Sequence, residues 1–236
     1  MNKSKYLNYS HYLDKKYDGP KEFQKEILKI IQKNKDTTFN LNILDIGTAK
    51  GELIKFLSSK IKKANFIGID KEKSLIENAF KVENCIFKRM NILKYNDESK
   101  KKFDVIICSG LLSIFNEKEL PIFMDNVSKI LKKKGLLIIF APLNIYGIDM
   151  INKFRKNSFK LGVWESGWNI FSKQFVEFLS IKRFSKITFK KFNLNKVLKK
   201  KKDLIRTWTL STEKNKNQLT NGLMLLIDHY FIIIKK

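Results

Sequence analysis

The sequence predicts an α/β protein with a doubly wound, seven-stranded, mostly parallel sheet whose last strand is antiparallel. Three observations carry this prediction: apolar runs of strand length, amphipathic segments between them, and a change of pattern after residue 142. The runs are rich in Ile, Val and Phe with few interior charges, as in strands buried on both faces of a parallel sheet. They cover residues 42–46, 65–70, 85–90, 103–109 and 135–142.

Amphipathic segments of helical period separate these runs, at 51–63, 72–80 and 118–134. Strand–helix alternation of this kind predicts right-handed crossovers in one sheet. Because three lysines precede Gly135, we expect this glycine to be a helix C-cap, with the lysines at the negative end of the helix dipole. Another helix is expected before the first strand, where apolar residues recur at helical spacing: Phe23, Ile27, Leu28, Ile30 and Ile31.

The pattern after residue 142 predicts one more helix and two closing strands. Residues 171–181 have a helical period, and Ser172 is a good N-cap candidate. Residues 187–194 are strand-like, 196–203 form a lysine-rich loop, and 222–236 are a helical turn plus a strand, or one bent strand. The two closing strands are expected to pair antiparallel at the sheet edge. We therefore predict a single domain over residues 1–236.

The charge balance is strongly basic, with 48 Lys and Arg against 23 Asp and Glu, a net charge of +25. Such a balance is typical of nucleic-acid binding, but only four of the 48 are arginines, the residue best suited to bidentate phosphate recognition. The lysines are also scattered, so a solvated surface is favoured and a nucleic-acid partner is not excluded. The apolar runs fall short of the ~20 residues of a membrane span, and no signal peptide is evident. We expect a cytoplasmic protein with reduced thiols at Cys85 and Cys108.

A glycine loop follows the first predicted strand, in the stretch from Asp45 to Gly51. Ligands of open parallel sheets bind beyond the carboxyl ends of the strands, where this loop lies. The loop has neither the dinucleotide fingerprint nor a P-loop, since Glu52 stands where the fingerprint needs its last glycine. Glu52 would repel a phosphate but not a cationic ligand.

Two polar residues follow the next two strands. Asp70 can accept hydrogen bonds from both ribose hydroxyls of an adenosine, and the Asn91 amide can meet an adenine edge. Taken singly, each has a simpler interpretation, Asp70 as a helix N-cap and Asn91 as a turn residue. Their joint spacing at strand ends predicts an adenosine ligand that carries positive charge, which is S-adenosylmethionine, with S-adenosylhomocysteine as its product.

The motifs "ILDIGTAKGEL", "FIGID", "KRMNIL" and "FDVIICSGLL", in this order over residues 40–142, resemble the class I S-adenosylmethionine-dependent methyltransferases. Ala49 stands where that family has a middle glycine, and Asn91 where it often has an aspartate. The resemblance implies a Rossmann-like methyltransferase fold, with residues 41–142 as the cofactor-binding half. It implies this set of cofactor-binding residues: Asp45, Gly47, Thr48, Ala49, Gly51, Asp70, Lys71, Asn91, Ile92, Ser109 and Gly110.

The family implies a methyl transfer, and the acceptor has to be argued separately. The segment from Ser109 to Leu112 lacks the [Asp/Asn]-Pro-Pro-aromatic loop of enzymes that methylate exocyclic amines of adenine or cytosine, or glutamine amides. Cys108 is expected to be a packed thiol, not a nucleophile. We expect O- or N-methylation of a small molecule: a metabolite, a sugar or a lipid-linked precursor. An RNA or protein methyltransferase, or a non-catalytic adenosine-binding protein, remain the alternatives.

Few residues are candidates for the acceptor side. His11 is the candidate general base, in an N-terminal part (1–40) that would form a helical lid, with an ordinary surface histidine as the alternative. Trp164, Trp168 and Tyr12 are candidate acceptor contacts, the first two in the substrate-side half (143–236), where a hydrophobic plug is the alternative. His229 is expected to be a core or edge residue. No metal site is expected, and the oligomeric state stays open.

Overall fold

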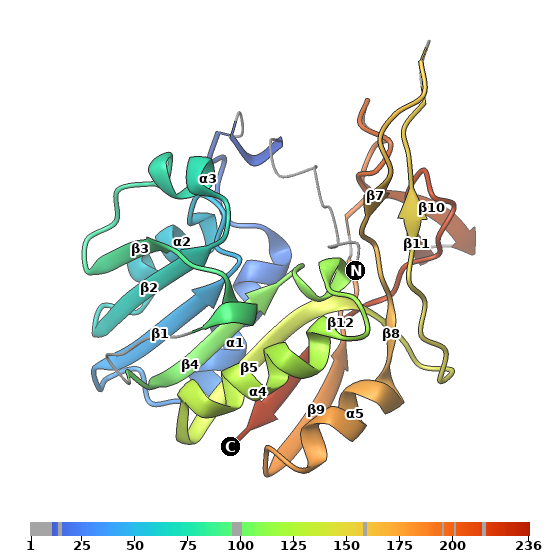
Figure 1. The fold of residues 1–236 in the computed structure, drawn as a ribbon. Helices are drawn as coiled ribbons and strands as arrows, with labels where there is room; N and C mark the ends of the chain where they lie inside the picture. The colour runs from blue at the N-terminus through green and yellow to red at the C-terminus, as the bar shows by residue number, and fades with distance from the viewer. Residues whose placement is uncertain are drawn as a thin grey trace.

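The computed structural model describes residues 11–13, 16–95, 101–157, 160–194, 196–200, 202–213 and 216–236. Its centre is a mixed sheet with the strand order β3-β2-β1-β4-β5-β12-β9, and the short strand β8 (Phe171–Ser172) pairs with the end of β5 (Figure 1). The five strands from β3 to β5 are parallel, whereas β12 runs antiparallel to both of its neighbours. The strands are β1 (Leu41–Ile46), β2 (Ala64–Asp70), β3 (Cys85–Arg89), β4 (Phe103–Ser109), β5 (Leu131–Asn144), β9 (Lys186–Lys191) and β12 (His229–Lys235).

The predicted doubly wound sheet is therefore confirmed, including its antiparallel last strand, which lies between β5 and β9. Helices α1 (Glu22–Asn34) and α2 (Glu52–Lys60) bury their apolar residues on one face of the sheet. Helices α4 (Glu119–Ile130) and α5 (Lys173–Ile181) cover the other face. Both faces are filled because successive side chains of the central strands point to opposite sides and nearly all of them are apolar.

Several predicted element ends are wrong. Helix α4 stops at Ile130, and the three lysines after it belong to β5, so Gly135 is not a helix C-cap. The reason is Leu131, which is fully buried and pairs with Phe103 as an extended residue. The predicted helix 72–80 shrinks to α3 (Lys73–Glu77). At the chain end, a single turn closed by the Met224 N–H and the Asn221 carbonyl lies where a helical turn was predicted, and β12 starts only at His229.

Other details of the prediction hold. Ser172 is the N-cap of α5, and its hydroxyl accepts the Phe175 N–H at 3.1 Å. Cys108 is fully buried in the core, and burial raises the pKa of its thiol, so it is a packed thiol. Cys85 is partly buried, and burial raises its pKa to about 12. Among the described residues, no helix is long and apolar enough to cross a membrane.

Two hairpins extend the substrate-side half beyond the sheet, and the sequence pattern predicted neither. One pairs β6 (Lys153–Phe154) with β7 (Glu165–Ser166), and the other pairs β10 (Trp208–Glu213) with β11 (Lys216–Thr220). In Figure 1 both lie on the side toward which the parallel strands point. They therefore stand next to the carboxyl edge of the sheet, where the glycine loop lies.

Candidate active site

In the glycine loop between β1 and α2, every second residue has a left-handed backbone conformation. Gly47, Ala49 and Gly51 have φ of +74°, +50° and +82°, the left-handed region that glycine adopts at no steric cost. The Gly47 N–H donates to the Ile69 carbonyl at 2.9 Å, and the Ala49 N–H donates to the Asp70 carboxylate at 3.0 Å. The loop is thus held against the end of β2, with its backbone open toward the carboxyl edge.

Gly51 is required for packing as well as for its backbone angle. A Cβ on Gly51 would lie 2.4 Å from the ring of Phe87 on β3. That ring also lies against Gly68, where a Cβ would be 2.7 Å away. Since the ring is held between two glycines, it has little room to move away.

Two acids flank the loop. Asp45, at the end of β1, is 3% exposed, and burial, together with the charge of Asp70, raises the pKa of its carboxyl to about 7. The Thr48 hydroxyl lies buried beside the Asp45 carboxyl, and its hydrogen bond to the carboxyl offsets part of this rise in pKa. A buried carboxylate favours a ligand that brings positive charge.

Asp70 and Asn91 occupy the ends of β2 and β3 as predicted. One Asp70 oxygen accepts the Ala49 N–H and the other accepts the Glu72 N–H at 3.0 Å, so the carboxylate faces the glycine loop and is not the N-cap of α3. Asn91 caps the short 3-10 helix Ile92–Lys94, because its side-chain oxygen accepts the Leu93 N–H at 3.0 Å. Both are partly buried at the same edge of the sheet.

The other predicted cofactor residues differ in their surroundings. Ile92 is buried in the core, whereas Lys71 is exposed, with its amine 3.8 Å from the Glu72 carboxylate. Ser109 ends β4 and lies beside the loop. Gly110 follows it with a φ of +76° and open space where a Cβ would be.

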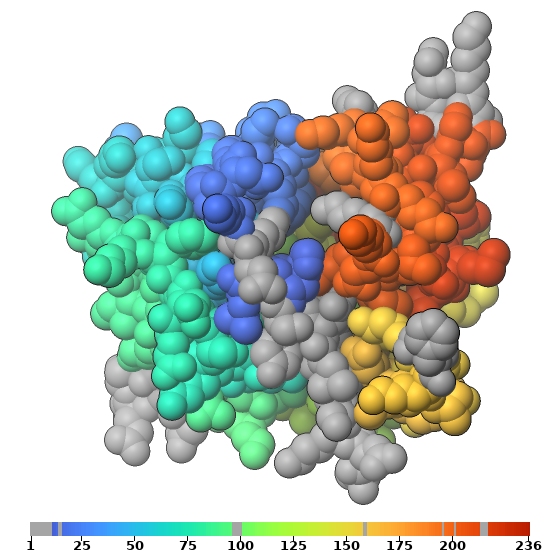
Figure 2. Space-filling model, turned by 90° about the horizontal axis from the view of Figure 1, so that it is seen from above, coloured from blue at the N-terminus to red at the C-terminus, as the bar shows by residue number. Residues whose placement is uncertain are grey.

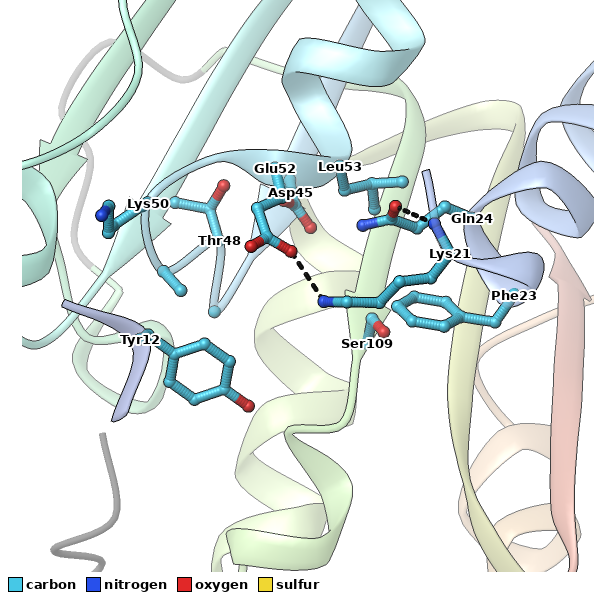
Figure 3. Close-up of a pocket in the computed structure, with 12 residues that line it drawn as sticks. Tyr12, Lys21, Phe23, Gln24, Asp45, Thr48, Lys50, Glu52, Leu53 and Ser109 are labelled. Carbon is cyan, nitrogen blue, oxygen red and sulfur yellow. Dashed lines mark hydrogen bonds and ion pairs between the residues drawn. The ribbon is translucent and has the colours of Figure 1, made fainter. Parts of the chain in front are cut away.

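A cavity of about 80 Å³ adjoins the glycine loop, between the loop and the N-terminal part of the chain. Figure 3 shows Tyr12, Lys21 and Phe23 facing Asp45 and Thr48 across it. The lining residues are Tyr12, Lys21, Phe23, Gln24, Asp45, Gly47, Thr48, Ala49, Lys50, Glu52, Leu53 and Ser109. Five of the predicted cofactor residues and one predicted acceptor contact, Tyr12, are therefore brought together.

The N-terminal part is tied to the loop by charged side chains. The Lys21 ammonium reaches across the cavity to the Glu52 carboxylate at 2.6 Å. The Lys50 ammonium donates to the Leu13 carbonyl at 2.7 Å, and the Arg206 guanidinium lies 5.2 Å from the Tyr12 ring centre. Glu52 was predicted to repel phosphate, but its charge is partly compensated by Lys21.

The sequence interpretation missed Lys21, Phe23 and Gln24. Gln24 is 2% exposed, and its side-chain oxygen accepts the Lys21 N–H at 2.8 Å, which fixes the start of α1. The sequence signal that could have indicated its role is the polar side chain of Gln24 on the apolar face of the predicted helix. Phe23 stacks on Phe140 at 4.8 Å between ring centres, and Phe140 stacks on His229 at 5.0 Å.

The two histidines differ in environment. Burial lowers the pKa of His229 to about 4, so its ring is neutral at physiological pH, and its Nδ1 has no hydrogen-bond partner within the described residues. His229 begins β12, which agrees with the expected core or edge position. His11 contacts the Tyr12 ring edge-on at 5.8 Å and does not line the cavity. Its role as a base stays a prediction.

Trp164 and Trp168 do not line this cavity either. Trp164 is 57% exposed, and the Arg155 guanidinium lies 5.1 Å from its ring centre. Trp168 has a φ of +57°, and its carbonyl accepts a hydrogen bond from the Asn152 amide. Their roles as acceptor contacts stay predictions.

Residues 43–135 match the family model of a methyltransferase domain. The sheet order and the geometry of the glycine loop agree with that match. The match identifies a methyltransferase domain within this chain, and the sheet has the Rossmann-like fold of S-adenosylmethionine-dependent methyltransferases. The domain thus includes β1 to β4, α2, α4 and the loops at the carboxyl edge that carry the candidate site.

Similar proteins support the domain assignment. A protein of Invertebrate iridescent virus 6 named as a methyltransferase, 235L, is 29% identical over 119 residues, which are 50% of this chain and 43% of that protein. The chain spans about half the length of the curated relatives it matches.

The fold of the methyltransferase domain recurs in solved structures. A S-adenosylmethionine-dependent methyltransferase of Methanosarcina mazei has a TM-score of 0.61 at 18% identity, covering 88% of this chain and 96% of that one. The N-methyltransferase NodS of Bradyrhizobium japonicum, solved with S-adenosylhomocysteine, has a TM-score of 0.57 at 13% identity, covering 98% of this chain and 97% of NodS. At these identities the likeness concerns the fold.

Proposed function

We propose that this protein transfers a methyl group from S-adenosylmethionine to an oxygen or nitrogen of a small molecule. The observation that carries the proposal is the arrangement at the carboxyl edge. Asp45 and the left-handed glycine loop line one cavity, and Asp70 holds the loop from the end of β2 through the Ala49 N–H. No phosphate-binding loop accompanies these acids, so the site suits an adenosine ligand with positive charge.

The residues present fit such a ligand. Asp70 would hold the ribose hydroxyls, Asn91 and Ile92 would border the adenine, and the loop from Gly47 to Gly51 would approach the methionine end. Asp45, with the Thr48 hydroxyl beside it, would receive its ammonium group, because an ionised buried carboxylate is stabilised by a nearby cation. S-adenosylmethionine supplies an electrophilic methyl group on a sulfonium centre when it is bound.

The chain's contribution to the transfer is alignment and exclusion of water. Tyr12 and Phe23 line the cavity opposite the glycine loop, and the hydrogen bond from Lys50 to the Leu13 carbonyl ties the segment of Tyr12 to the loop. The cavity of about 80 Å³ is smaller than the ~300–1,000 Å³ typical of ligand sites. The Lys21 side chain crosses it, so we expect the Lys21–Glu52 contact to shift when the ligand enters.

A small-molecule acceptor is favoured because Tyr12, Lys21 and Phe23 of the N-terminal part line a small cavity together with Ser109. NodS, which shares the fold, is an N-methyltransferase, and this supports the choice of acceptor atom. His11 is the proposed base where the acceptor must lose a proton, and Trp164 and Trp168 remain proposed acceptor contacts. The net charge of +25 is the observation that favours an RNA acceptor instead.

The first test is calorimetric titration with S-adenosylmethionine, S-adenosylhomocysteine and NADH. We expect micromolar binding of the two adenosyl-sulfur ligands and none of NADH. Binding of NADH, or of no ligand, would refute the assignment of the loop. Transfer of a labelled methyl group to an RNA in preference to a panel of small hydroxyl and amine compounds would refute the acceptor class alone. Cofactor binding without transfer to any acceptor would favour the non-catalytic alternative.

A further inference from the structure

The hairpin between Met150 and Ile170 projects from the substrate-side half, past the rest of the molecule (Figure 1). Its base is firmly docked: the buried Asn169 donates its amide to the Phe115 carbonyl at 2.7 Å and its backbone N–H to the Ser113 carbonyl at 2.9 Å. Both carbonyls belong to the segment that follows β4. The base of the projection is therefore fixed to the carboxyl edge.

The end of this hairpin exposes large apolar side chains. Leu161, Val163 and Trp164 are 70%, 60% and 57% exposed. Gly162 lies among them, and a Cβ there would be 2.0 Å from the Lys156 carbonyl oxygen, so the two arms are packed backbone to backbone. The close packing of the arms leaves no room for the apolar side chains between them, and they point outward.

The charges of the same segment have one sign. Arg155, Lys156 and Lys160 are exposed, and the sequence from 153 to 164 contains no Asp or Glu. The next acid, Glu165, is 7% exposed and lies 3.9 Å from the Lys156 ammonium, so it adds little negative charge to the surface. We name the six residues Arg155, Lys156, Lys160, Leu161, Val163 and Trp164 the hairpin tip.

We infer that the hairpin tip docks on the surface of an anionic lipid bilayer. Apolar side chains that enter the interface, flanked by cations that stay at the headgroups, are the two components of peripheral membrane binding. A tryptophan ring with a polar edge suits the interfacial layer. The inference does not depend on the proposed methyl transfer.

Nucleic acid fits the hairpin tip less well. Leu161 and Val163 offer no flat face for stacking on bases, and the guanidinium of Arg155 already lies over the Trp164 ring. In Figure 2, seen from above, the hairpin and the N-terminal part of the chain are visible on the same face. Docking by the tip would thus turn the side of the molecule that carries the candidate site toward the lipid.

Sedimentation with vesicles tests the inference on the full chain. We expect the protein to pellet with phosphatidylcholine vesicles that contain phosphatidylglycerol, and not with phosphatidylcholine alone. The triple variant Leu161→Ser, Val163→Ser, Trp164→Ser should lower the vesicle partition at least about tenfold. Each substitution removes the free energy that an apolar side chain gains when it moves from water into the bilayer interface. The variant Arg155→Glu, Lys160→Glu should lower it by a similar factor.

Matched variants elsewhere separate the tip from general effects. Phe178→Ser, Ile181→Ser removes apolar side chains of 69% and 78% exposure from α5, and Lys62→Glu, Lys63→Glu makes the same change in net charge away from the hairpin. Both should bind vesicles like wild type. The inference would be overturned if vesicle binding fell equally in the tip variants and the matched variants. It would also be overturned if the protein bound a short RNA tightly through the hairpin tip and did not bind vesicles. Circular dichroism and thermal melting check that each variant is folded.

Discussion

The two halves of this molecule treat apolar residues differently. Between residues 41 and 144, Ile86 and Ile122 are the large apolar side chains that the structure describes as exposed. The part from 145 to 228 exposes a long series of them: Ile145, Tyr146, Ile148, Ile151, Leu161, Val163, Trp164, Phe178, Ile181, Val197, Leu204, Leu210, Met224 and Leu226. The first half uses its apolar residues to build a core, and the second presents many of them to its surroundings.

This difference fits the two tasks proposed for the protein. The proposed cofactor half has to hold a glycine loop and two acids in place, which strands buried on both faces allow. The substrate-side half is proposed to meet an acceptor or a membrane, and exposed apolar side chains suit such contacts. Paired substitutions in the two halves, matched in geometry, can test this separation.

The largest effect is expected from Gly51→Ala, with Gly147→Ala as its match. The two glycines have φ of +82° and +81°, but a Cβ on Gly51 would be 2.4 Å from Phe87, whereas on Gly147 the nearest atom, in Gln174, is 3.7 Å away. Backbone strain and overlap together should destabilise the Gly51 variant by roughly 2–5 kcal/mol, against roughly 1–2 kcal/mol from strain alone at Gly147. Urea unfolding measures both. Equal costs would mean that the Phe87 ring moves aside freely.

Asp70→Ala should come next. The substitution removes the acceptor for the Ala49 and Glu72 N–H groups and the proposed ribose contacts. Each lost hydrogen bond to a charged group is worth about 1.5–3 kcal/mol, so cofactor affinity should fall at least tenfold in calorimetric titration. Asp70→Asn keeps one acceptor oxygen and should lose less. Wild-type affinity in the alanine variant would contradict the assignment of Asp70.

Asp45→Asn should change the pH dependence of the unfolding free energy and, separately, the affinity for the cofactor. Since burial raises the pKa of Asp45 from its ordinary 3.8 to about 7, the folded protein binds a proton between these values that the unfolded chain releases. The contribution of Asp45 to stability therefore falls as pH rises from about 4 to 7 and is constant above. The asparagine variant has no such slope, so its stability relative to wild type should increase over this range.

The same Asp45 variant should bind S-adenosylmethionine more weakly than wild type at pH 7.5, because it lacks the charge that receives the ammonium group. Urea unfolding from pH 5 to 8 gives the first quantity and calorimetry the second. A difference in unfolding free energy that does not change with pH would mean that Asp45 is ionised throughout. A variant with unchanged affinity would place the ammonium group elsewhere.

The sequence predicted the cofactor half well for a physical reason. Strands such as Phe103–Ser109 are apolar on both faces and have a single way to be buried, and the glycine loop follows one of them directly. The apolar pattern placed Asp70 at the end of the second strand and Asn91 after the third, where the structure has them. Element ends were less predictable: Lys132 to Lys134 suited a helix end by charge, but the burial of Leu131 turned the chain into a strand there.

The substrate-side half was less predictable because its elements depend on contacts between distant residues. The hairpin of β6 and β7 has only two residues in each strand and is held by Asn169 reaching the segment after β4. No local period indicates such a contact. Lys21 and Phe23 were missed for the same reason, since their place at the cavity depends on how α1 packs against Phe140 and the glycine loop.

The smallest effects are expected from two ion pairs with the same length of 2.6 Å, Lys21–Glu52 at the cavity and Lys191–Asp228 in the substrate-side half. The lysines are 36% and 48% exposed, so Lys21→Met and Lys191→Met should each change stability by no more than about 1 kcal/mol. They should differ in binding. Lys21 lies across the cavity, and its removal leaves Glu52 to attract a cationic ligand, so S-adenosylmethionine should bind a few-fold tighter in Lys21→Met and unchanged in Lys191→Met. Weaker binding in Lys21→Met would instead mean that Lys21 turns from Glu52 to the carboxylate of the ligand.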